Sequence, residues 1–490
     1  MILTRRKFIR AAGLLALAPY LDVRGEPAIW VNDIHSQLNR TRVRALLTPR
    51  TLDELTAAVR RAADDRLPIS VSGCRHSMGG QQFATDGISI DSRQLTRVLA
   101  FDRERGLIEA EAGIQWPKLI DFYLDAQRGG SHQWGIAQKQ TGADTFTLGG
   151  SLSANVHGRG LAMKPLISNV ESFTLVNSEG KTVPCSRSEN PELFRAAIGG
   201  YGLFGLISRV TLRLIPRRKL RRVVEVIRSD DAHKRFTERI ADGFLYGDFQ
   251  FSIDEKSPDF LRIGVFSCYQ PIADDAPMSA TKRLNEDDWL GLMVLAYTDR
   301  AKGFQRYVDY YLSTNGQTYW SDTNQLSAYL PNYAQALKEK IPGKNESSLI
   351  ITEIYVPRAA LADFLAQAAE SLRTLGVPVI YGTVRLIEKD DESFLPWARE
   401  SYACIIFNLL TIHTPAGIEA SARAFRALID LAIARGGSYY LTYHRFATRE
   451  QVAKCHPRFA SFLALKKKYD PDERFQSDWY RHYRAAFARD

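Results

Sequence analysis

The sequence predicts an α+β protein of two units, and two patterns carry this prediction. Residues 45–71 read as a strand, a helix and a second strand, because Thr51 or Asp53 can cap a helix that runs to about Ala63. Beyond about residue 218, strand-like runs alternate with amphipathic segments of helical period. The 490 residues are enough for two or three compact domains.

Local signals predict the other elements of the first unit. These are strands at 88–91 and 106–113, a helix from Trp116 to Ala126, a hairpin with its turn at 178–180, and a short helix from Pro191 to Ala197. The sequence turns basic after Pro216, and we place the boundary of the unit there.

The second unit and the tail are expected to alternate in the same way. The expected elements are strands at 249–253, 348–356 and 404–408, a helix at 359–374, and a final helix at 450–469 that ends before Pro471. Residues 475–480 can then return to the first unit. The expected domains are therefore 35–218 and 219–444, with a C-terminal segment 445–490 that completes the first.

The composition is that of a soluble globular protein, with 45% hydrophobic and 24% charged residues. The net charge is +10, but there is no long basic block beyond Lys466–Lys468, so nucleic-acid binding is not expected. The five cysteines are scattered and odd in number, and the sequence lacks the spacings typical of zinc sites, haem sites or disulfide frameworks. We therefore expect no metal.

Residues 1–25 have the pattern of an export signal. Paired Arg5 and Arg6 precede Phe8 and an apolar run at 11–18, which resembles a twin-arginine signal and is shorter than the ~20 residues that span a bilayer. We expect export by the twin-arginine route to a periplasmic or secreted location, with a membrane attachment only if Pro19 prevents cleavage. Because such substrates cross the membrane folded, commonly with a redox cofactor inserted, the signal also predicts a cofactor.

Gly200, Gly202 and Gly205 match the spacing of a dinucleotide-binding fingerprint, but their context differs from it. The fingerprint requires a strand before it and a helix after it, whereas here a helix precedes and a strand follows. A Rossmann domain is therefore not expected. The glycines still allow the backbone to approach a flat or anionic group closely.

Two loops rich in small residues suit one extended nucleotide. The first, residues 71–80, follows a strand and combines glycines and serines with Arg75 and His76. The second, residues 147–160, is again rich in glycine and serine and contains His157. Backbone N–H groups in such loops form anion-binding nests that no bulky side chain blocks, which predicts a cradle for a diphosphate.

These loops resemble those of the vanillyl-alcohol oxidase / p-cresol methylhydroxylase (PCMH-type) flavoproteins, and the resemblance covers most of the chain after the signal. Residues 73–77 are similar to the histidine loop of the alditol and aldonolactone oxidases, and residues 147–160 and 199–207 to the decaprenylphosphoryl-ribose oxidases. The resemblance implies a two-part PCMH-type FAD-binding domain with an α+β substrate (cap) domain. It assigns contacts with FAD to Ser72, Gly73, Cys74, Arg75, His76, Ser77, Thr147, Gly149, Gly150, Ser153, Asn155, His157, Gly158, Gly202, Gly205 and Ile207.

The two groups of relatives hold their flavin differently. In the aldonolactone group the loop histidine is bonded to the flavin 8α-methyl, whereas the ribose oxidases bind FAD noncovalently. Because the matching loop contains the histidine itself, we expect one covalent link, through His76. Segment 138–142, where some relatives form a second link, contains no cysteine.

Candidate catalytic residues come from the second unit and its end. Arg385 matches the arginine of a Glu-x-Arg strand in the aldonolactone group, where it stabilises the reduced flavin, whereas Thr383 replaces the glutamate. Tyr443 or His444, depending on register, stands in the place of a family lysine, and either can take the hydroxyl proton. His444 is the stronger base at neutral pH if its pKa is ordinary, at about 6.5. His157 resembles a histidine at the flavin face.

The expected function is FAD-dependent oxidation of a CH–OH group in a small polyol, sugar or lactone-like substrate, by hydride transfer to flavin N5. Oxygen or another electron acceptor would reoxidise the flavin, and the sequence does not separate an oxidase from a dehydrogenase. A FAD-bearing binding protein without turnover is an alternative, because the family's glutamate and lysine are both missing.

Overall fold

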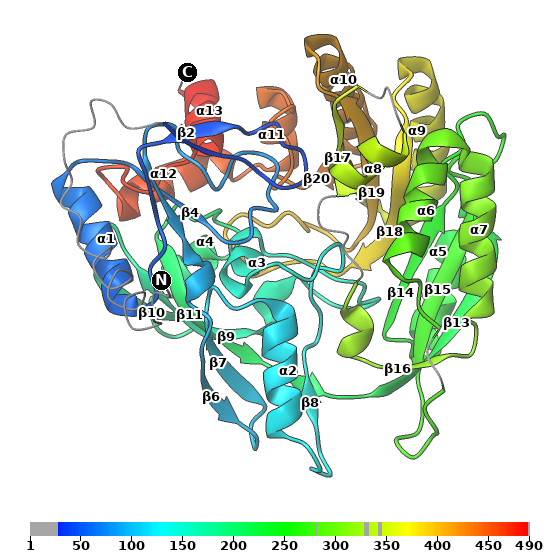
Figure 1. Cartoon of the computed structure of the whole chain (residues 1–490), viewed down its shortest axis with the longest axis horizontal. Helices are drawn as coiled ribbons and strands as arrows, with labels where there is room; N and C mark the ends of the chain where they lie inside the picture. Colours follow the sequence, from blue (N-terminus) through cyan, green and yellow to red (C-terminus); the bar gives the residue numbers. More distant parts are fainter. Residues whose placement is uncertain (1–27, 280–281, 328–332, 342–344, 489–490) are drawn as a thin grey trace, which may run out of the picture.

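The computed structural model describes residues 28–279, 282–327, 333–341 and 345–488. Two halves lie side by side (Figure 1), one formed by both ends of the described chain and the other by its middle. Helices combine with mainly antiparallel sheets, which confirms the α+β class. The predicted signal at residues 1–25 lies outside the described residues.

A small parallel sheet opens the first half, with strand order β3 (Ala45–Leu47), β5 (Ile88–Asp91) and β4 (Ile69–Ser72). Helix α1 (Leu52–Asp64) connects β3 to β4. It begins after Thr51, whose side chain accepts a hydrogen bond from the Glu54 N–H, as the capping signal predicts. Leu55 and Val59 bury the apolar face of α1 in a cluster with the sheet.

A five-stranded antiparallel sheet forms most of the rest of this half, in the order β10 (Thr182–Ser186), β9 (Val170–Val176), β11 (Leu206–Arg213), β7 (Leu107–Glu111) and β6 (Val98–Asp102). The accompanying helices are α2 (Trp116–Ala126), α3 (Leu148–Ala154) and α4 (Pro191–Ala197). Helices α2 and α4 have the predicted bounds, and β9 and β10 form the predicted hairpin. Residues 200–205 lie between α4 and β11, so a helix does precede them and a strand follows.

The second half is built on an eight-stranded antiparallel sheet. Its strands are ordered β16 (Thr318–Trp320), β13 (Lys219–Arg228), β15 (Ile263–Pro271), β14 (Tyr246–Phe251), β18 (Val379–Ile387), β19 (Tyr402–Ile412), β17 (Ser347–Pro357) and β20 (Ser438–Tyr439). The register aligns Thr383, Ile406 and Glu353 in one row, and Arg385 and Cys404 in a row of the same face two residues along. This face carries the side chains of the site described below.

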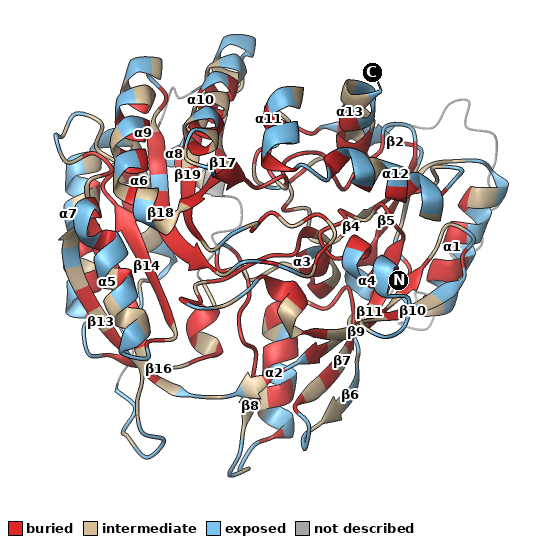
Figure 2. Ribbon diagram, turned by 180° about the vertical axis from the view of Figure 1, so that it is seen from behind, coloured by how far each residue is buried: buried red, intermediate tan, exposed pale blue. Residues whose placement is uncertain are grey.

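Helices cover both faces of this sheet. On one face lie α5 (Ser229–Ala241), α9 (Leu361–Leu375) and α10 (Pro415–Ile433), and on the other α6 (Glu286–Thr298) and α7 (Arg300–Ser313), with α8 (Tyr333–Lys340) beside α6. Adjacent residues of β15 point to opposite faces of the sheet. Phe266 contacts Phe236 of α5, whereas Val265 packs with Val308 of α7. Buried strands therefore lie between helices whose outer sides are exposed (Figure 2).

The C-terminal segment ends in α11 (Arg449–Cys455), α12 (Phe459–Tyr469) and α13 (Asp478–Phe487). Residues 450–469 are therefore mostly helical and end where expected, but they form two helices rather than one continuous helix. The chain breaks around Pro457, because proline lacks the N–H that continues a helix and its ring disfavours helical geometry in the residue before it. Beyond α12, Phe475 forms a parallel bridge with Ile69 of β4, which seats the tail on the small parallel sheet.

Short elements complete the halves and join them. The strand pairs are β1 (Ile29–Val31) with β2 (Thr41–Val43), and β8 (Trp134–Gly135) with β12 (Ile215–Pro216); the 3₁₀ turns are Ser92–Gln94, Leu166–Asn169, Thr323–Gln325 and Arg358–Ala360. Buried Asp322 links the halves, since it accepts hydrogen bonds from Arg217 at 2.9 Å and from Tyr123 at 3.1 Å. Among the described residues, no helix is both long and apolar enough to cross a membrane.

Candidate active site

The two predicted loops meet in one cavity of the first half. Residues 73–77, directly after β4, and residues around the start of α3 both line it. The loops touch, because a Cβ added to Gly73 would lie 2.2 Å from Thr147 Oγ1, an approach that only glycine allows. The remaining predicted residues of this first cavity come from α3, from the connection between α4 and β11 and from the start of β11, namely Gly149, Gly150, Ser153, Gly202, Gly205 and Ile207.

The first cavity fits the FAD that the resemblance implies. Gly202 has a φ of 74°, which favours glycine, and a Cβ placed on it would meet no atom within 4 Å. Because Gly202 lines the cavity, a side chain there would occupy space that the surrounding residues leave open. Glycine and serine on the facing loops let backbone N–H groups approach an anionic diphosphate.

His76 is held firmly at the wall of this cavity. Its Nδ1 lies 2.8 Å from His35 Nε2 and its Nε2 lies 2.8 Å from Thr145 Oγ1, and its ring stacks on Phe146. Burial, and then the neighbouring His35, hold the pKa of His76 well below its usual value. His76 is therefore a neutral imidazole at neutral pH, the form that can act as a nucleophile.

Some predicted FAD residues do not line the first cavity: Ser72, Asn155, His157 and Gly158. Asn155 ends α3 in the left-handed region and donates a hydrogen bond to Asp390 at 3.0 Å. Gly158 packs against a backbone carbonyl that would lie 2.6 Å from an added Cβ. His157 points instead toward the second half. Direct contact of these residues with FAD stays a prediction, because a motif does not decide which way each side chain turns.

A second cavity of about 310 Å³ adjoins the first, between the sheet face of the second half and the helices α6 and α7. His35, Gln140, Ile351 and Tyr443 line both cavities. The cavities therefore meet at these side chains, and a substrate in the second cavity can reach a group bound in the first.

Arg385 lines the second cavity and is 6% exposed. Its Nε and Nη1 are without hydrogen-bond partners among the described residues. A buried guanidinium with unpaired donors is costly unless a bound ligand or water satisfies them. Arg385 is thus suited to hold an oxygen that carries or develops negative charge.

Glu353 of β17 is a buried carboxylate beside Arg385 that sequence reasoning missed. Its Oε1 lies 2.5 Å from His157 Nε2, and its Oε2 accepts a hydrogen bond from the Tyr443 hydroxyl at 3.1 Å. Burial acts to raise the pKa of Glu353, but His157, Arg385 and the Tyr443 hydrogen bond together outweigh it, so the pKa lies below the ordinary value. Glu353 is therefore ionised at neutral pH.

The strand register places Glu353 in the same row as Thr383. The resembling families carry a glutamate where this chain has Thr383, and the Thr383 hydroxyl instead donates to the Phe249 carbonyl at 3.3 Å. Thr383 and Glu353 each pair with Ile406, from opposite sides of β19. Glu353 therefore lies two strands from Thr383 on the same sheet face.

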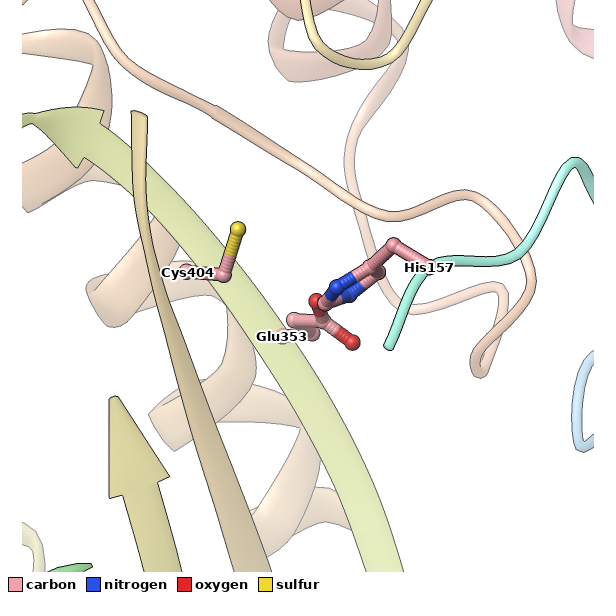
Figure 3. Close-up of side chains that lie close together, drawn as sticks. All are labelled: His157, Glu353 and Cys404. Atoms are coloured by element: carbon pink, nitrogen blue, oxygen red, sulfur yellow. The ribbon is translucent and has the colours of Figure 1, made fainter. Parts of the chain in front are cut away.

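His157, Glu353 and Cys404 form a buried cluster whose nitrogen, oxygen and sulfur atoms lie within 4.8 Å of one another (Figure 3). His157 Nδ1 contacts the Gly158 carbonyl at 3.1 Å, and because a carbonyl only accepts, Nδ1 carries a hydrogen. The short contact between Nε2 and Glu353 then holds one further proton between imidazole and carboxylate. Burial and then Glu353 raise the pKa of Cys404 well above its usual value, which disfavours the thiolate that binds metals.

The loop between β20 and α11 presents Tyr443, rather than His444, to the cavities. Tyr443 lines both, whereas His444 is absent from both linings, contacts Ser36 Oγ at 3.1 Å and stacks on Phe446. Burial lowers the pKa of His444 to about 4. His444 would be the stronger base only with an ordinary pKa, and burial makes it a weaker base than that. The geometry favours Tyr443.

The residues that sequence reasoning missed had weak signals. Glu353 interrupts the apolar run of a predicted strand, and a carboxylate on a buried strand seldom lacks a partner, so it offered a usable indication. His35 lies in the connection between β1 and β2 and has no motif around it. Only the fold brings it against His76.

Comparison with known proteins agrees with this geometry. A family profile described as an FAD binding domain matches residues 43–186, which include both loops. The chain is 23% identical to an L-gulono-1,4-lactone dehydrogenase of Mycobacterium tuberculosis, over 89% of this chain and 95% of that protein. It is 24% identical to an L-gulonolactone oxidase of Scyliorhinus torazame (88% and 93% covered) and 25% identical to cytokinin dehydrogenase 5 of Oryza sativa subsp. japonica (87% and 84% covered).

Proposed function

We propose that this chain, which belongs to the vanillyl-alcohol oxidase / p-cresol methylhydroxylase superfamily of FAD-dependent oxidoreductases, oxidises a CH–OH group of a small substrate. One observation carries the proposal: the buried series Tyr443, Glu353 and His157 begins at the junction of the two cavities, beside Arg385. Two of the relatives are named for lactones, which supports the polyol, sugar and lactone class as the first compounds to test.

The proposed role of the series is to take the hydroxyl proton of the substrate. The substrate O–H donates to the Tyr443 oxygen while Tyr443 passes its own proton to Glu353 Oε2, 3.1 Å away. Burial, and then Glu353, raise the pKa of Tyr443 well above its usual value, so Tyr443 conducts a proton and does not stand as a phenolate. His157, on the other Glu353 oxygen, stabilises the carboxylate before the transfer.

The carbon side of the reaction requires FAD. When bound, FAD accepts the hydride that leaves the substrate carbon, and the product is a carbonyl compound. Arg385 is proposed to stabilise the negative charge that then develops near the junction, because it lines the second cavity and two of its buried donors are without partners among the described residues. Oxygen or a separate electron acceptor completes turnover, and the relatives' names include both dehydrogenases and an oxidase.

Anaerobic reduction of bound FAD tests this function. Alcohols, polyols and lactones are mixed with the holoprotein without oxygen, and bleaching of the flavin is followed in time. We expect Tyr443→Phe to slow bleaching by about 10²-fold or more, because a positioned proton acceptor usually contributes a rate factor of that size. The FAD content should be unchanged. His444→Phe, the matched control from the same loop, should keep a rate of the same order.

Two other outcomes would count against the proposal. A Tyr443→Phe protein as fast as the wild type would remove Tyr443 from the proton path. If no compound in the panel bleaches the wild-type flavin, the chain behaves as a FAD-bearing binding protein without turnover.

The N-terminus supports a proposal about location. We propose that residues 1–25 direct export by the twin-arginine route to a periplasmic or secreted location, on the sequence pattern around Arg5 and Arg6. Replacing both arginines with lysine should leave the FAD-loaded protein in the cytoplasmic fraction of a twin-arginine-competent host. Equal export of the wild type and this variant, measured by immunoblot of cell fractions, would contradict the proposal.

A further inference from the structure

The second cavity is walled mainly by apolar side chains. Helix α6 contributes Trp289, Leu292 and Met293, and helix α7 contributes Phe304 and Tyr307. The two helices are joined only by residue 299 and lie together over the sheet face (Figure 1). The polar side chains of His35, Gln140 and Tyr443 line both cavities, at their junction. Those of Gln250, Arg385 and Asn408 line the second cavity alone.

Tyr381 shows how much apolar surface this wall leaves open. It lies on β18, which has β14 and β19 on its two sides, yet it is 39% exposed, and it lines the second cavity. A large aromatic ring that stays partly exposed in the cavity offers contact surface to an apolar ligand.

Such a wall discriminates strongly between substrate types. A polyol that enters the cavity brings several hydroxyl groups, and each one buried without a partner weakens binding by roughly tenfold or more. An apolar group gains from the same wall, and each buried methylene strengthens binding by about fourfold. A single hydroxyl is satisfied at the polar junction, by Tyr443 and Arg385.

Resting on the proposed oxidation of a CH–OH group, we infer that the substrate is an alcohol with an apolar alkyl or aromatic body, and not a polyol or sugar. The apolar body packs between α6, α7 and Tyr381, and the hydroxyl reaches Tyr443. The C–H hydride passes to FAD and the O–H proton to the Tyr443–Glu353 pair, which leaves an aldehyde or ketone.

A homologous series of alcohols tests this inference on the holoprotein. Ethanol, butanol, hexanol and octanol are compared with a polyol, xylitol, and a lactone, gulonolactone, by anaerobic flavin reduction. We expect the apparent second-order rate constant of reduction to rise by about threefold to fourfold per methylene until the cavity is full. Xylitol and gulonolactone should lie below hexanol.

The outcomes separate this inference from the proposed function. If xylitol or gulonolactone reduces the flavin faster than every alkanol, the apolar substrate is wrong but CH–OH oxidation stands. If none of the compounds reduces the flavin, both fail.

Met293→Gln provides an independent readout, because it adds a polar amide to the wall with little change of shape. It should flatten the dependence of the reduction rate on chain length. Val294→Thr, on the same helix but outside the lining, should keep the full dependence. A Met293→Gln protein with the wild-type slope would overturn the placement of the apolar body against α6.

Discussion

Glu353→Gln is expected to lower the rate of flavin reduction by about 10²- to 10⁴-fold while the protein still binds FAD. Glutamine keeps the shape of the side chain and can still accept from Tyr443, but it has no carboxylate to receive the proton. Its neutral amide also leaves the His157 proton without a charged partner. The rate is measured by anaerobic mixing with the best substrate, and FAD content by the absorbance of the purified protein.

The pH profile separates a proton acceptor from a merely structural carboxylate. Glu353 must be ionised to work, and its pKa lies below the ordinary value, so the wild-type rate should hold as pH falls and decline only below the ordinary titration range of a glutamate. The Gln variant should show no such decline. Glu346→Gln, an exposed carboxylate just before β17, is the matched control and should behave as the wild type. A Glu353→Gln rate within tenfold of the wild type would exclude Glu353 as the acceptor.

His76→Ala is expected to abolish covalent attachment of the flavin completely. We propose that a neutral His76, held by His35 and Thr145 at the wall of the first cavity, would bond to the flavin 8α-carbon. That carbon would lose a hydrogen as a proton, and the flavin ring would take up the two electrons and pass them to oxygen or another acceptor. Acid precipitation of the wild type should then leave the yellow colour with the peptide, and mass analysis should find the added flavin on the fragment that contains His76. The variant should release all of its flavin into the supernatant.

His132→Ala is the control for the tether, because His132 is an exposed histidine outside the first cavity. It should retain the flavin as the wild type does. Flavin released from the wild type itself would favour a noncovalent site like that of the ribose oxidases. Flavin retained by His76→Ala would assign the link to another residue.

Local sequence determined much of the fold. The Thr51 cap, the period of α1, the bounds of α2 and α4 and the hairpin of β9 and β10 all depend on neighbouring residues, and local signals are enough to predict them. The same reasoning did not predict the break within 450–469. The apolar pattern of a helix continues across Pro457, but the backbone leaves the helical conformation there. The small residues of the two loops also indicated one nucleotide cavity, because their freedom of approach is a property of the residues themselves.

Only the tertiary structure decided the chemistry of the site. The family resemblance led us to look for a carboxylate at position 383, where this chain has a threonine. The antiparallel register brings Glu353 from β17 into the same row as Thr383. Sequence preferred His444 over Tyr443 from ordinary pKa values. In the structure, burial lowers the pKa of His444 to about 4, and Tyr443 rather than His444 lines the two cavities. Strand register, side-chain direction and burial arise from contacts between distant segments, so they are absent from any local pattern.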